Sequence, residues 1–441
     1  MFLYSCLVLV ILFSQGNADF NPVTFTLGQN AHVDHVAAAN NTDVPFNVMI
    51  TTNGSPNLNS GRFVCSNDGL YKFQVYALTK SGANVFLEIY HNTQLVASLW
   101  GHTNSDYAAA GNAVVLPLRT GDTVEVKVRG DYEVHLYGDT GQIYTTFTGV
   151  QLGAAESLIE GSSLSAFSAT LNQHEVVTSG SPVLYNNILT DVNQGYNQST
   201  GIYKAPSGGL YLFHFFSLAR QGEEEWQELF RNDQYVCSIY GKDSQEWADA
   251  GNSVLLHLNA GDQVSIKSHN GRTSTLFGSP DQIYSTFSGV QIATDYDLAT
   301  DVGSFGFSAG LTQHQLVHMD TNVVYDQVFY DDQGAYDRTT GTFTAPTSGL
   351  YEFNYHALGK QGVAIWLELF HNDQYINSLY SHIINNWATG GNAAVLNLMA
   401  GDRVSVRAHN NQALFGDPGQ IYCTFTGYLL SKGSDAVVIG K

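Results

Sequence analysis

One ten-residue segment occurs three times in this chain, at intervals of 140 residues, and it limits the fold more than any other feature. The segment reads GLYKFQVYAL from Gly69, GLYLFHFFSL from Gly209 and GLYEFNYHAL from Gly349. Without gaps, residues 201–240 and 341–380 share 20 identical residues in 40 positions. The chain is therefore built from three copies of one unit.

Other short motifs recur in the same order in each copy. Gly-Leu-Tyr starts at 69, 209 and 349, Gly-Asn at 111, 251 and 391, and Gly-Asp at 121, 261 and 401. Gln-Ile-Tyr starts at 142, 282 and 420, so the third copy lacks two residues there, which marks a surface loop. A unit of this length is longer than the roughly 20–50 residues of a solenoid repeat and can bury its own core. We therefore expect three domains in tandem.

The residue pattern inside each copy is typical of strands. Apolar and polar residues alternate in VEVKV (Val124–Val128) and VSVRA (Val404–Ala408), each directly after a Gly-Asp turn. The runs WLELF and YINSLY flank His-Asn-Asp-Gln, a plausible hairpin connection. No long stretch has helical periodicity. Each copy is predicted to be an antiparallel sandwich, and its core is predicted to contain these aromatic residues: Tyr71, Phe73, Phe147, Tyr211, Phe213, Phe287, Tyr351, Phe353 and Phe425.

The first 18 residues have the pattern of a secretory signal peptide. The apolar run Phe2–Phe13 is too short to cross a bilayer and small residues follow it, although no Lys or Arg precedes it. No later segment is apolar for long enough to cross a membrane. We expect a signal peptide at 1–18 and a secreted, extracellular mature protein without membrane insertion.

Charge and cysteine content restrict the partners and the framework. The formal net charge of −21 opposes binding to nucleic acid or other polyanions through a broad electrostatic surface, and it leaves neutral glycans, proteins and cations open as partners. After the signal peptide the chain contains Cys65, Cys237 and Cys423, an odd number at non-matching positions, so no disulfide framework is predicted. Cys423 shares its face with Phe425 and is expected to be a buried small residue. At least one thiol is unpaired or pairs with another chain.

Several motifs together resemble the C1q domain, the globular head of complement component 1q. The third copy contains FSAGLTQHQLV, GTFTAPTSGLYEFNYHAL, GGNAAVLNLMAGDRVSVRA and IYCTFTGYLL, and the second contains FSATLNQHEVV, TGIYKAPSGGLYLF and FSGVQI. The first copy departs most, with Cys65 and Ser66 where the others have Ala-Pro. The resemblance implies an all-β chain of three tandem ten-stranded jelly rolls at 20–152, 165–292 and 305–430, with a tail at 431–441. It also implies that such heads pack in threes around an axis.

The segments between the copies bear on how the heads assemble. From Leu152 to Phe167, and again from Ile292 to Phe307, there are 14 intervening residues. Such a segment reaches about 45 Å when extended at ~3.3 Å per residue. One hypothesis is therefore a covalent pseudo-trimer within the chain, because short tethers give a high effective concentration. The alternative is three beads that dock with other chains or do not dock at all.

Recurring polar residues provide candidate sites. His32, His174 and His314 each follow an entry phenylalanine by seven residues. A histidine at such a position can bind metal or sense pH, and the alternative is a hydrogen-bonded histidine at a strand end. Asp331 and Asp332 lie in a loop rich in oxygen-bearing side chains and are the calcium candidates, with turn chemistry as the alternative.

Acidic and asparagine motifs complete the candidates. The run Glu223–Glu225 is interpreted as a solvated loop, with a patch for a basic partner as the alternative. Asn40, Asn53 and Asn197 begin N-x-S/T sequons, so the protein is predicted to be a glycoprotein.

No catalytic arrangement is recognised: the sequence has no nucleophile elbow, no P-loop and no dinucleotide glycine pattern, and no enzyme activity is predicted. By resemblance, the expected function is lectin-like pattern recognition in innate immunity, in which loops bind a glycan or protein ligand on cell or microbial surfaces. Calcium is the one candidate cofactor. The alternatives are a network-forming matrix protein and a cytokine-like ligand of the tumour necrosis factor type.

Overall fold

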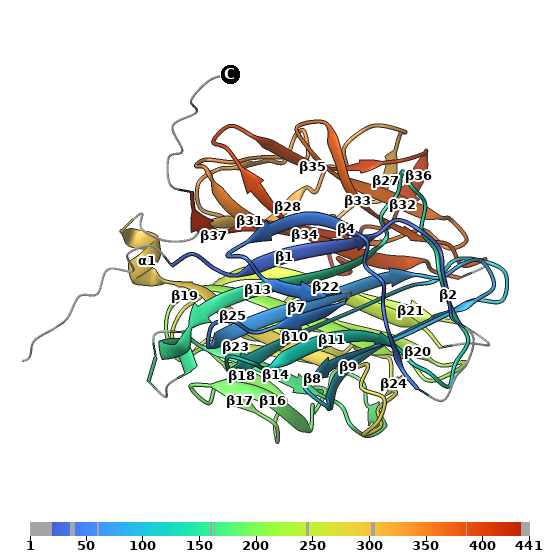
Figure 1. The fold of residues 1–441 in the computed structure, drawn as a ribbon. Helices are drawn as coiled ribbons and strands as arrows, with labels where there is room; N and C mark the ends of the chain where they lie inside the picture. Colours follow the sequence, from blue (N-terminus) through green and yellow to red (C-terminus); the bar gives the residue numbers. More distant parts are fainter. Residues whose placement is uncertain are drawn as a thin grey trace, which may run out of the picture.

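The computed structural model describes residues 20–35, 40–59, 61–158, 161–162, 164–243, 247–300, 305–384 and 386–433. The predicted signal peptide at 1–18 and residues 434–441 of the predicted tail lie outside these ranges. The described residues form three sandwiches in sequence order, which we name head 1, head 2 and head 3 (Figure 1). The predicted all-β fold of three tandem jelly rolls is confirmed.

Head 1 has two main sheets and a two-stranded ribbon. The inner sheet, which faces the other heads, contains in spatial order β10 (Ala109–Leu118), β7 (Gly69–Leu78), β13 (Thr145–Ala154), β1 (Thr24–Gln29) and β4 (Val48–Asn53). The outer sheet contains β5 (Asn57–Asn59), β6 (Arg62–Val64), β11 (Thr123–Val128), β8 (Asn84–His91) and β9 (Gln94–His102), with β3 (Thr42–Asp43) paired to β11. The ribbon joins β2 (Val33–His35) and β12 (Val134–Leu136).

Head 2 repeats this arrangement with two five-stranded sheets. Its inner sheet contains β16 (Asn187–Val192), β14 (Ala166–Thr170), β25 (Thr286–Thr294), β19 (Gly209–Leu218) and β22 (Asp249–Leu258). The outer sheet contains β17 (Tyr196–Asn197), β18 (Ile202–Lys204), β23 (Gln263–Ser268), β20 (Glu224–Arg231) and β21 (Gln234–Lys242). The ribbon joins β15 (Glu175–Val177) and β24 (Ser274–Leu276).

Head 3 has the same two five-stranded sheets. The inner sheet contains β28 (Gln327–Asp331), β26 (Gly306–Gly310), β37 (Thr424–Lys432), β31 (Gly349–Leu358) and β34 (Thr389–Leu398). The outer sheet contains β29 (Tyr336–Asp337), β30 (Thr342–Thr344), β35 (Arg403–Ala408), β32 (Ile365–His371) and β33 (Gln374–Ser381), and the ribbon joins β27 (Gln315–Val317) and β36 (Gln412–Leu414). Strand β37 ends two residues beyond the predicted boundary at 430.

Two short helices follow the first two heads. They are η1 (Ala155–Leu158) and α1 (Asp295–Ala299), and α1 begins with a capping box between Thr294 and Asp297. Among the described residues, no helix has the length and apolar character that a bilayer crossing requires.

Turn chemistry accounts for the strand ends. The predicted hairpin in head 3 joins β32 and β33 through Asn372 and Asp373, whose φ angles of 46° and 65° fit the two-residue turn that matches the twist of paired strands. Gly401, in the Gly-Asp turn before β35, has a φ of 90°, which favours glycine. These residues fix the register of the strands that follow.

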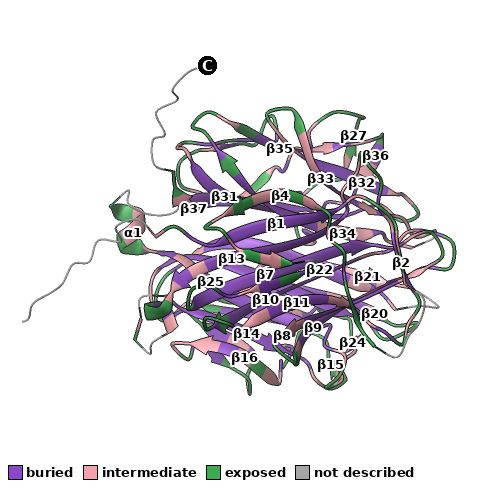
Figure 2. Cartoon of the chain, in the orientation of Figure 1, coloured by how far each residue is buried: buried purple, intermediate pink, exposed green. Residues whose placement is uncertain are grey.

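Each head has its own aromatic core between its two sheets. All nine aromatic residues of the predicted core are 1% exposed or less. The interior strands are buried and the connecting loops carry most of the exposed residues (Figure 2). One edge-to-face pair recurs with ring centroids 4.8–5.0 Å apart, which shows that the core geometry is repeated: Phe25–Phe147, Phe167–Phe287 and Phe307–Phe425.

The three heads are packed against one another. The equivalent strands β10, β22 and β34 contact each other in pairs, and β22, β10 and β7 cross the middle of the molecule in Figure 1. Full burial of one leucine side chain stabilises a structure by about 1.5–3 kcal/mol, so the apolar side chains buried between the heads stabilise their packing. One buried apolar cluster contains residues of all three heads: Leu70, Val115, Ala166, Leu210, Leu212, Leu255, Val290, Ala293 and Tyr428.

Candidate functional site

The asparagine of the recurring Gly-Asn motif joins each head to the next. Asn112 Nδ2 donates to the carbonyl oxygen of Tyr284 in head 2 at 2.9 Å, and Thr286 Oγ1 donates to Asn112 Oδ1 at 2.7 Å. The same pair of bonds runs from head 2 to head 3 and from head 3 to head 1: Asn252 with Tyr422 and Thr424, and Asn392 with Tyr144 and Thr146. These bonds form a closed cycle of three equivalent contacts.

The Gln-Ile-Tyr motif supplies the other side of each contact. Ser98 N donates to the carbonyl of Ile283 in head 2 at 2.5 Å, which is a main-chain bond between heads. Its two equivalents, at 2.8 Å each, are Ser238 to Ile421 and Ser378 to Ile143. Two motifs that recur in the sequence therefore meet across every junction, and both are explained by contact between heads.

A ring of three side chains marks the axis of this cycle. Tyr76, Phe216 and His356 occupy equivalent positions of β7, β19 and β31, and their ring centroids lie 5.9–6.2 Å from one another. Each ring covers the glycine of a Gly-Asn motif. A Cβ on Gly251 would lie 2.1 Å from the Phe216 ring, so only glycine fits there.

A buried ion pair lies further along the same strands. Lys72 Nζ is 2.6 Å from Glu352 Oε1, and both side chains are 0% exposed. Lys72 also donates to the Tyr428 hydroxyl at 2.9 Å, while Tyr428 and Gln74 donate to Glu352. Burial lowers the pKa of Lys72 despite the attraction of Glu352. Leu212 holds the equivalent position of head 2, so the three heads place a cation, an anion and an apolar side chain in one layer.

Between the ion pair and the ring, each strand carries one more polar residue. Gln74, His214 and Asn354 are buried, and five of their polar atoms have no hydrogen-bond partner among the described residues. Burial lowers the pKa of His214 well below its ordinary value, so this histidine is neutral. A buried polar atom without a partner costs about 1–3 kcal/mol. This layer therefore lowers the stability of the packed heads, and each head contributes a different polar residue to it.

The recurring histidines have an architectural role in the structure. His32 Nδ1 accepts a hydrogen bond from Gly138 N at 3.2 Å, and the His32 ring packs against Tyr137 at 5.0 Å. A Cβ on Gly138 would lie 2.3 Å from the carbonyl oxygen of residue 31, which explains the glycine. The same arrangement occurs in the other heads: His174 with Gly278 and Phe277, and His314 with Gly416 and Phe415. These three residues therefore match the second interpretation, in which the histidine is hydrogen-bonded within its own head rather than a metal ligand.

The calcium candidates Asp331 and Asp332 are adjacent, and their carboxylates accept hydrogen bonds from backbone N–H groups of the same head. The carboxylate of Asp331 accepts hydrogen bonds from Ala335 N at 2.9 Å and Tyr336 N at 3.2 Å, and Asp332 Oδ1 accepts one from Gly306 N at 3.3 Å. Within the described ranges, no three His, Cys, Asp or Glu side chains are grouped so that they could share a metal ion. Calcium binding at Asp331 and Asp332 stays a prediction.

The interpretation of Glu223–Glu225 as a solvated loop is wrong for its last residue. Strand β20 begins at Glu224, and its pleat turns Glu225 inward, where the side chain accepts a hydrogen bond from Ser217. Glu225 is 0% exposed, and burial raises its pKa well above the ordinary value. Glu223 is exposed and Glu224 is half-buried, so the run as a whole is not an acidic surface patch.

Cysteines and sequons occupy contrasting environments. The three thiols at 65, 237 and 423 are free and buried, as expected for Cys423. Asn40 and Asn197 are exposed. Asn53 is half-buried, and its Nδ2 donates to the carbonyl of Pro22 at 2.7 Å.

The axial residues are the functional candidates that the sequence does not reveal. Lys72 and Glu352 belong to strands with alternating character, so each is expected to face solvent. The signal that could have found them is the comparison of copies, because one position reads Lys, Leu and Glu while its neighbours stay alike. A second signal is that Gly-Asn recurs in all three copies inside a strand, where no tight turn requires a glycine.

The sandwiches and their cyclic contacts define a class: a single chain of three jelly-roll heads that meet at one axis. The family model described as C1q domain matches residues 24–152, 166–292 and 306–430. The chain belongs to the C1q domain family.

Curated relatives match this chain over about the length of one domain. Complement C1q tumor necrosis factor-related protein 3 of Homo sapiens is 34% identical over 126 residues, which cover 28% of this chain and 50% of that protein. Complement C1q tumor necrosis factor-related protein 6 of Mus musculus is 30% identical over 112 residues, which cover 25% of this chain and 42% of that protein. The chain thus spans half or less of the length of these relatives.

Among solved structures, the globular domain of zebrafish complement 1qA protein is similar, with 23% identity and a TM-score of 0.26. The match covers 30% of this chain and 99% of that structure. Eiger TNF from S. frugiperda is 14% identical with a TM-score of 0.25, and the match covers 30% of this chain and 92% of that structure.

Proposed function

We propose that this protein is a secreted, non-enzymatic recognition protein that acts as a single-chain pseudo-trimer of C1q heads. Its ligand class is glycans on microbial surfaces, bound in the manner of a lectin. The heads serve as a rigid frame, and exposed loops at their rims present the binding surface.

The observation that carries the proposal is the closed cycle of asparagine contacts. Asn112, Asn252 and Asn392 each donate a hydrogen bond to the next head, so all three junctions between heads are formed within one chain. The ion pair between Lys72 and Glu352 adds a contact that joins head 1 to head 3 directly. Such an assembly does not dissociate on dilution, because its heads are tethered.

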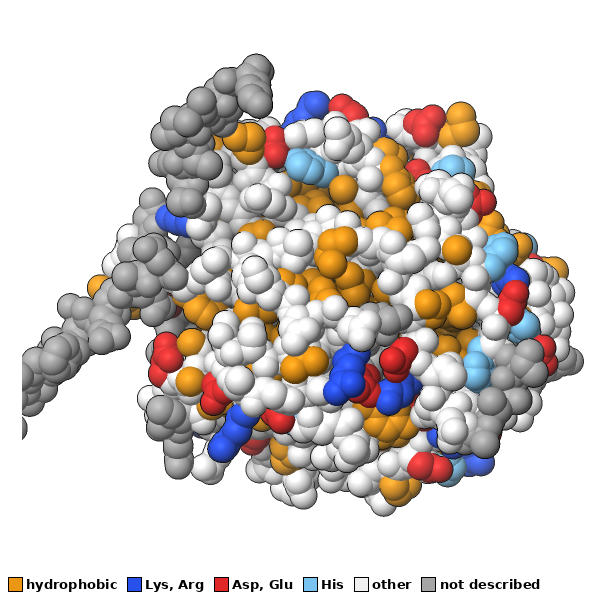
Figure 3. All heavy atoms as spheres, viewed as in Figure 1, with side chains coloured by type: hydrophobic (Ala, Val, Ile, Leu, Met, Phe, Trp, Pro, Cys, Tyr) orange, Lys and Arg blue, Asp and Glu red, His pale blue; other side chains and the backbone are white. Residues whose placement is uncertain are grey.

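The character of the surface supports an uncharged ligand. On the face shown in Figure 3, charged side chains are scattered in small groups among polar and apolar ones, with no broad basic patch. The net charge of −21 points the same way, because it repels polyanionic ligands.

The assembly is tested by light scattering on the purified protein. A mass near that of one chain, 48.1 kDa with the signal peptide, supports the pseudo-trimer. A mass about three times larger would mean that heads of different chains interlock.

The ligand class is tested on a glycan array and on whole bacteria, each with and without a chelator. Binding to a defined set of glycans supports the proposal, and its loss with chelator would support calcium at Asp331 and Asp332. Saturable binding to one cell type without glycan preference would favour a cytokine-like ligand. Insoluble higher-order material would favour a matrix protein.

A further inference from the structure

Tyr296 differs from the other tyrosines of the chain in its exposure. The chain contains 25 tyrosines, and all except Tyr4 lie in the residues that the structure describes. Of those described, Tyr296 alone is exposed, at 73%, while the others are buried or half-buried. It lies in α1, between head 2 and head 3, at one end of the molecule in Figure 1. Burial in a core therefore does not explain this ring.

The residues around Tyr296 are acidic. Asp295 and Asp297 flank it, and the Asp295 side chain is 55% exposed, with His257 Nε2 at 2.7 Å from Asp295 Oδ1. No Lys or Arg occurs in the sequence from residue 273 to residue 337. The two carboxylates therefore have no lysine or arginine nearby in the sequence to neutralise them.

The helix that carries Tyr296 is short and shallow. None of the residues of α1 is buried. The turn is held by the capping box of Thr294 and Asp297 and by a hydrogen bond from Thr300 N to the Tyr296 carbonyl oxygen at 3.1 Å. Opening such a turn breaks few contacts, so an enzyme can fit this segment into an active site while the heads stay folded.

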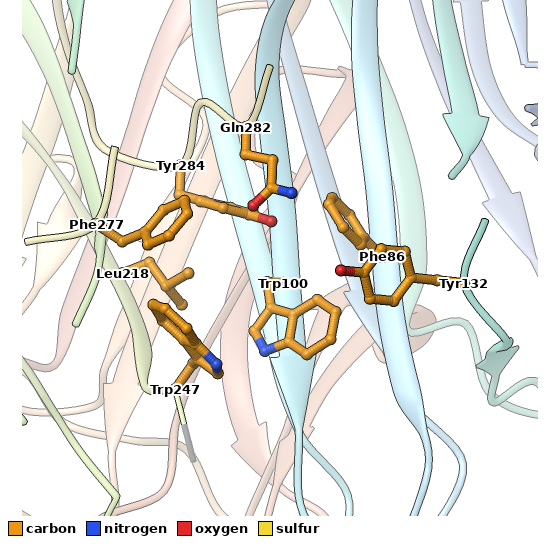
Figure 4. Close-up of a pocket in the computed structure, with 8 residues that line it drawn as sticks. All are labelled: Phe86, Trp100, Tyr132, Leu218, Trp247, Phe277, Gln282 and Tyr284. Carbon is orange, nitrogen blue, oxygen red and sulfur yellow. The ribbon is translucent and has the colours of Figure 1, made fainter. Parts of the chain in front are cut away.

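Tyr132 provides a comparison within the same chain. Tyr132 and Tyr296 are the two tyrosines with an acidic residue on both sides, and those beside Tyr132 are Asp131 and Glu133. The Tyr132 ring lines the narrow pocket between head 1 and head 2, where it packs on Phe86 at 4.9 Å and Trp100 at 5.7 Å (Figure 4).

The flanking charge also differs at this second tyrosine. Arg129 Nε lies 2.9 Å from Asp131 Oδ1, so one of the two acidic neighbours of Tyr132 is paired with a guanidinium. The two tyrosines thus share a local motif, but only Tyr296 combines an accessible hydroxyl with acidic neighbours that no Lys or Arg neutralises.

We propose that Tyr296 is a site of tyrosine O-sulfation. An accessible phenol between two carboxylates is the substrate that a protein-tyrosine sulfotransferase requires. The proposal rests on the secretion stated in the proposed function, because enzymes of this class act in the secretory pathway. It does not depend on the ligand of the heads.

The reaction is a group transfer from a nucleotide donor, 3′-phosphoadenosine 5′-phosphosulfate. The Tyr296 phenol oxygen forms a bond to the donor sulfur, the bond from that sulfur to the 5′-phosphate oxygen breaks, and adenosine 3′,5′-bisphosphate leaves. The phenol proton passes to a base of the transferase. A transferase that binds this polyanionic donor needs a basic active site, to which the carboxylates of Asp295 and Asp297 are complementary.

The test is sulfate transfer in vitro from radiolabelled donor to the full mature chain, with a purified protein-tyrosine sulfotransferase. One sulfate per chain is expected, and mass spectrometry of the digested protein should place it on Tyr296. Absence of transfer, or transfer to Tyr132 or another tyrosine in place of Tyr296, overturns the proposal.

Variants test the acceptor and its flanks separately. Tyr296→Phe should abolish transfer, and the matched control Tyr132→Phe should leave the rate within about twofold, because its hydroxyl is covered by neighbouring rings. Asp295→Asn combined with Asp297→Asn keeps the acceptor and should lower the rate at least about tenfold, since the complementary charges are lost. Loss of the Asp297 cap loosens α1 and increases access, so a lower rate reports charge. An unchanged rate overturns the role of the carboxylates.

Expression in animal cells separates this inference from the proposed function. Secreted protein with sulfate on Tyr296 supports both. Secreted protein with unmodified Tyr296 overturns the inference and leaves the proposed function standing, whereas a chain retained in the cells refutes the proposed secretion and leaves the transfer in vitro to decide the acceptor. A group on Tyr296 that alkaline phosphatase removes is a phosphate ester, which also overturns the inference.

Discussion

Replacing Glu352 by glutamine should weaken the contact between head 1 and head 3 more than any surface change. Glu352 accepts hydrogen bonds from Lys72, Gln74 and Tyr428, and both charged side chains are 0% exposed. The variant Glu352→Gln leaves the Lys72 ammonium buried without a counter-charge. Loss of one partner of a buried ion pair costs about 3–5 kcal/mol, and we expect this loss in the free energy of unfolding.

A double variant separates the charge pair from simple damage to the core. Head 2 has Leu212 in the same layer, so the site accepts an apolar residue. Lys72→Leu combined with Glu352→Leu removes both charges and leaves Tyr428 and Gln74 without their acceptor. Each unpaired group costs about 1–3 kcal/mol, whereas apolar replacement of a buried pair is often neutral or stabilising. The double variant should therefore lose less stability than the sum of the losses of Lys72→Leu and Glu352→Leu measured singly.

The assay is urea unfolding followed by tryptophan fluorescence, with light scattering to follow the packing of the heads. The control is the exposed pair of Lys80 and Asp34, whose charged atoms are 2.7 Å apart and whose side chains are 29% and 54% exposed. Asp34→Asn should cost at most about 1 kcal/mol, since solvent screens that pair. If Glu352→Gln costs no more than Asp34→Asn, the reasoning about the axis is wrong.

Three further predictions concern single groups. Burial lowers the pKa of His356 to about 3, so the unfolded chain takes up the proton first as pH falls below about 6.5, and this residue lowers stability by up to about 1.4 kcal/mol per pH unit. Burial lowers the pKa of His214 in the same direction, so His356→Phe should lose less stability than the wild-type protein between urea melts at pH 7 and pH 5, while the His214 contribution remains. Burial raises the pKa of Cys423 to about 12 and that of Cys237 in the same direction, so a thiol reagent should label them only after denaturation, as counted by mass spectrometry. Glycopeptide analysis of secreted protein should find glycan at exposed Asn197 and none at Asn53, whose amide nitrogen already donates two hydrogen bonds.

The parts of the fold that depend on local pattern were predictable from the sequence. The core residues Tyr71 and Phe73 follow a glycine and alternate along one strand, and they are buried as that pattern predicts. The hairpin at Asn372 follows from turn chemistry in the same way. Glu225 was misread because three consecutive acidic residues suggest a loop, whereas a strand that begins inside the run turns one of them inward.

The candidate site was not predictable, because its burial arises from contacts between heads. Lys72 and Glu352 each lie on the outward face of a single sandwich, where a charged residue is ordinary. A neighbouring head covers that face, and a sequence pattern within one copy contains no information about the neighbour. The pocket beside Trp100 has the same origin, since two heads supply its walls.

The two kinds of contact at the axis have different consequences for assembly. The asparagine bonds are identical at the three junctions, so they would hold three copies of any one head equally well. The ion-pair layer is different, because three copies of head 1 would bury three lysines together and three copies of head 3 would bury three glutamates. Like charges in a buried layer are strongly unfavourable, whereas Lys72, Leu212 and Glu352 are compatible in one chain. Divergence of the repeats at this layer therefore opposes rings made of three heads 1 or of three heads 3, while the shared asparagines keep the common geometry.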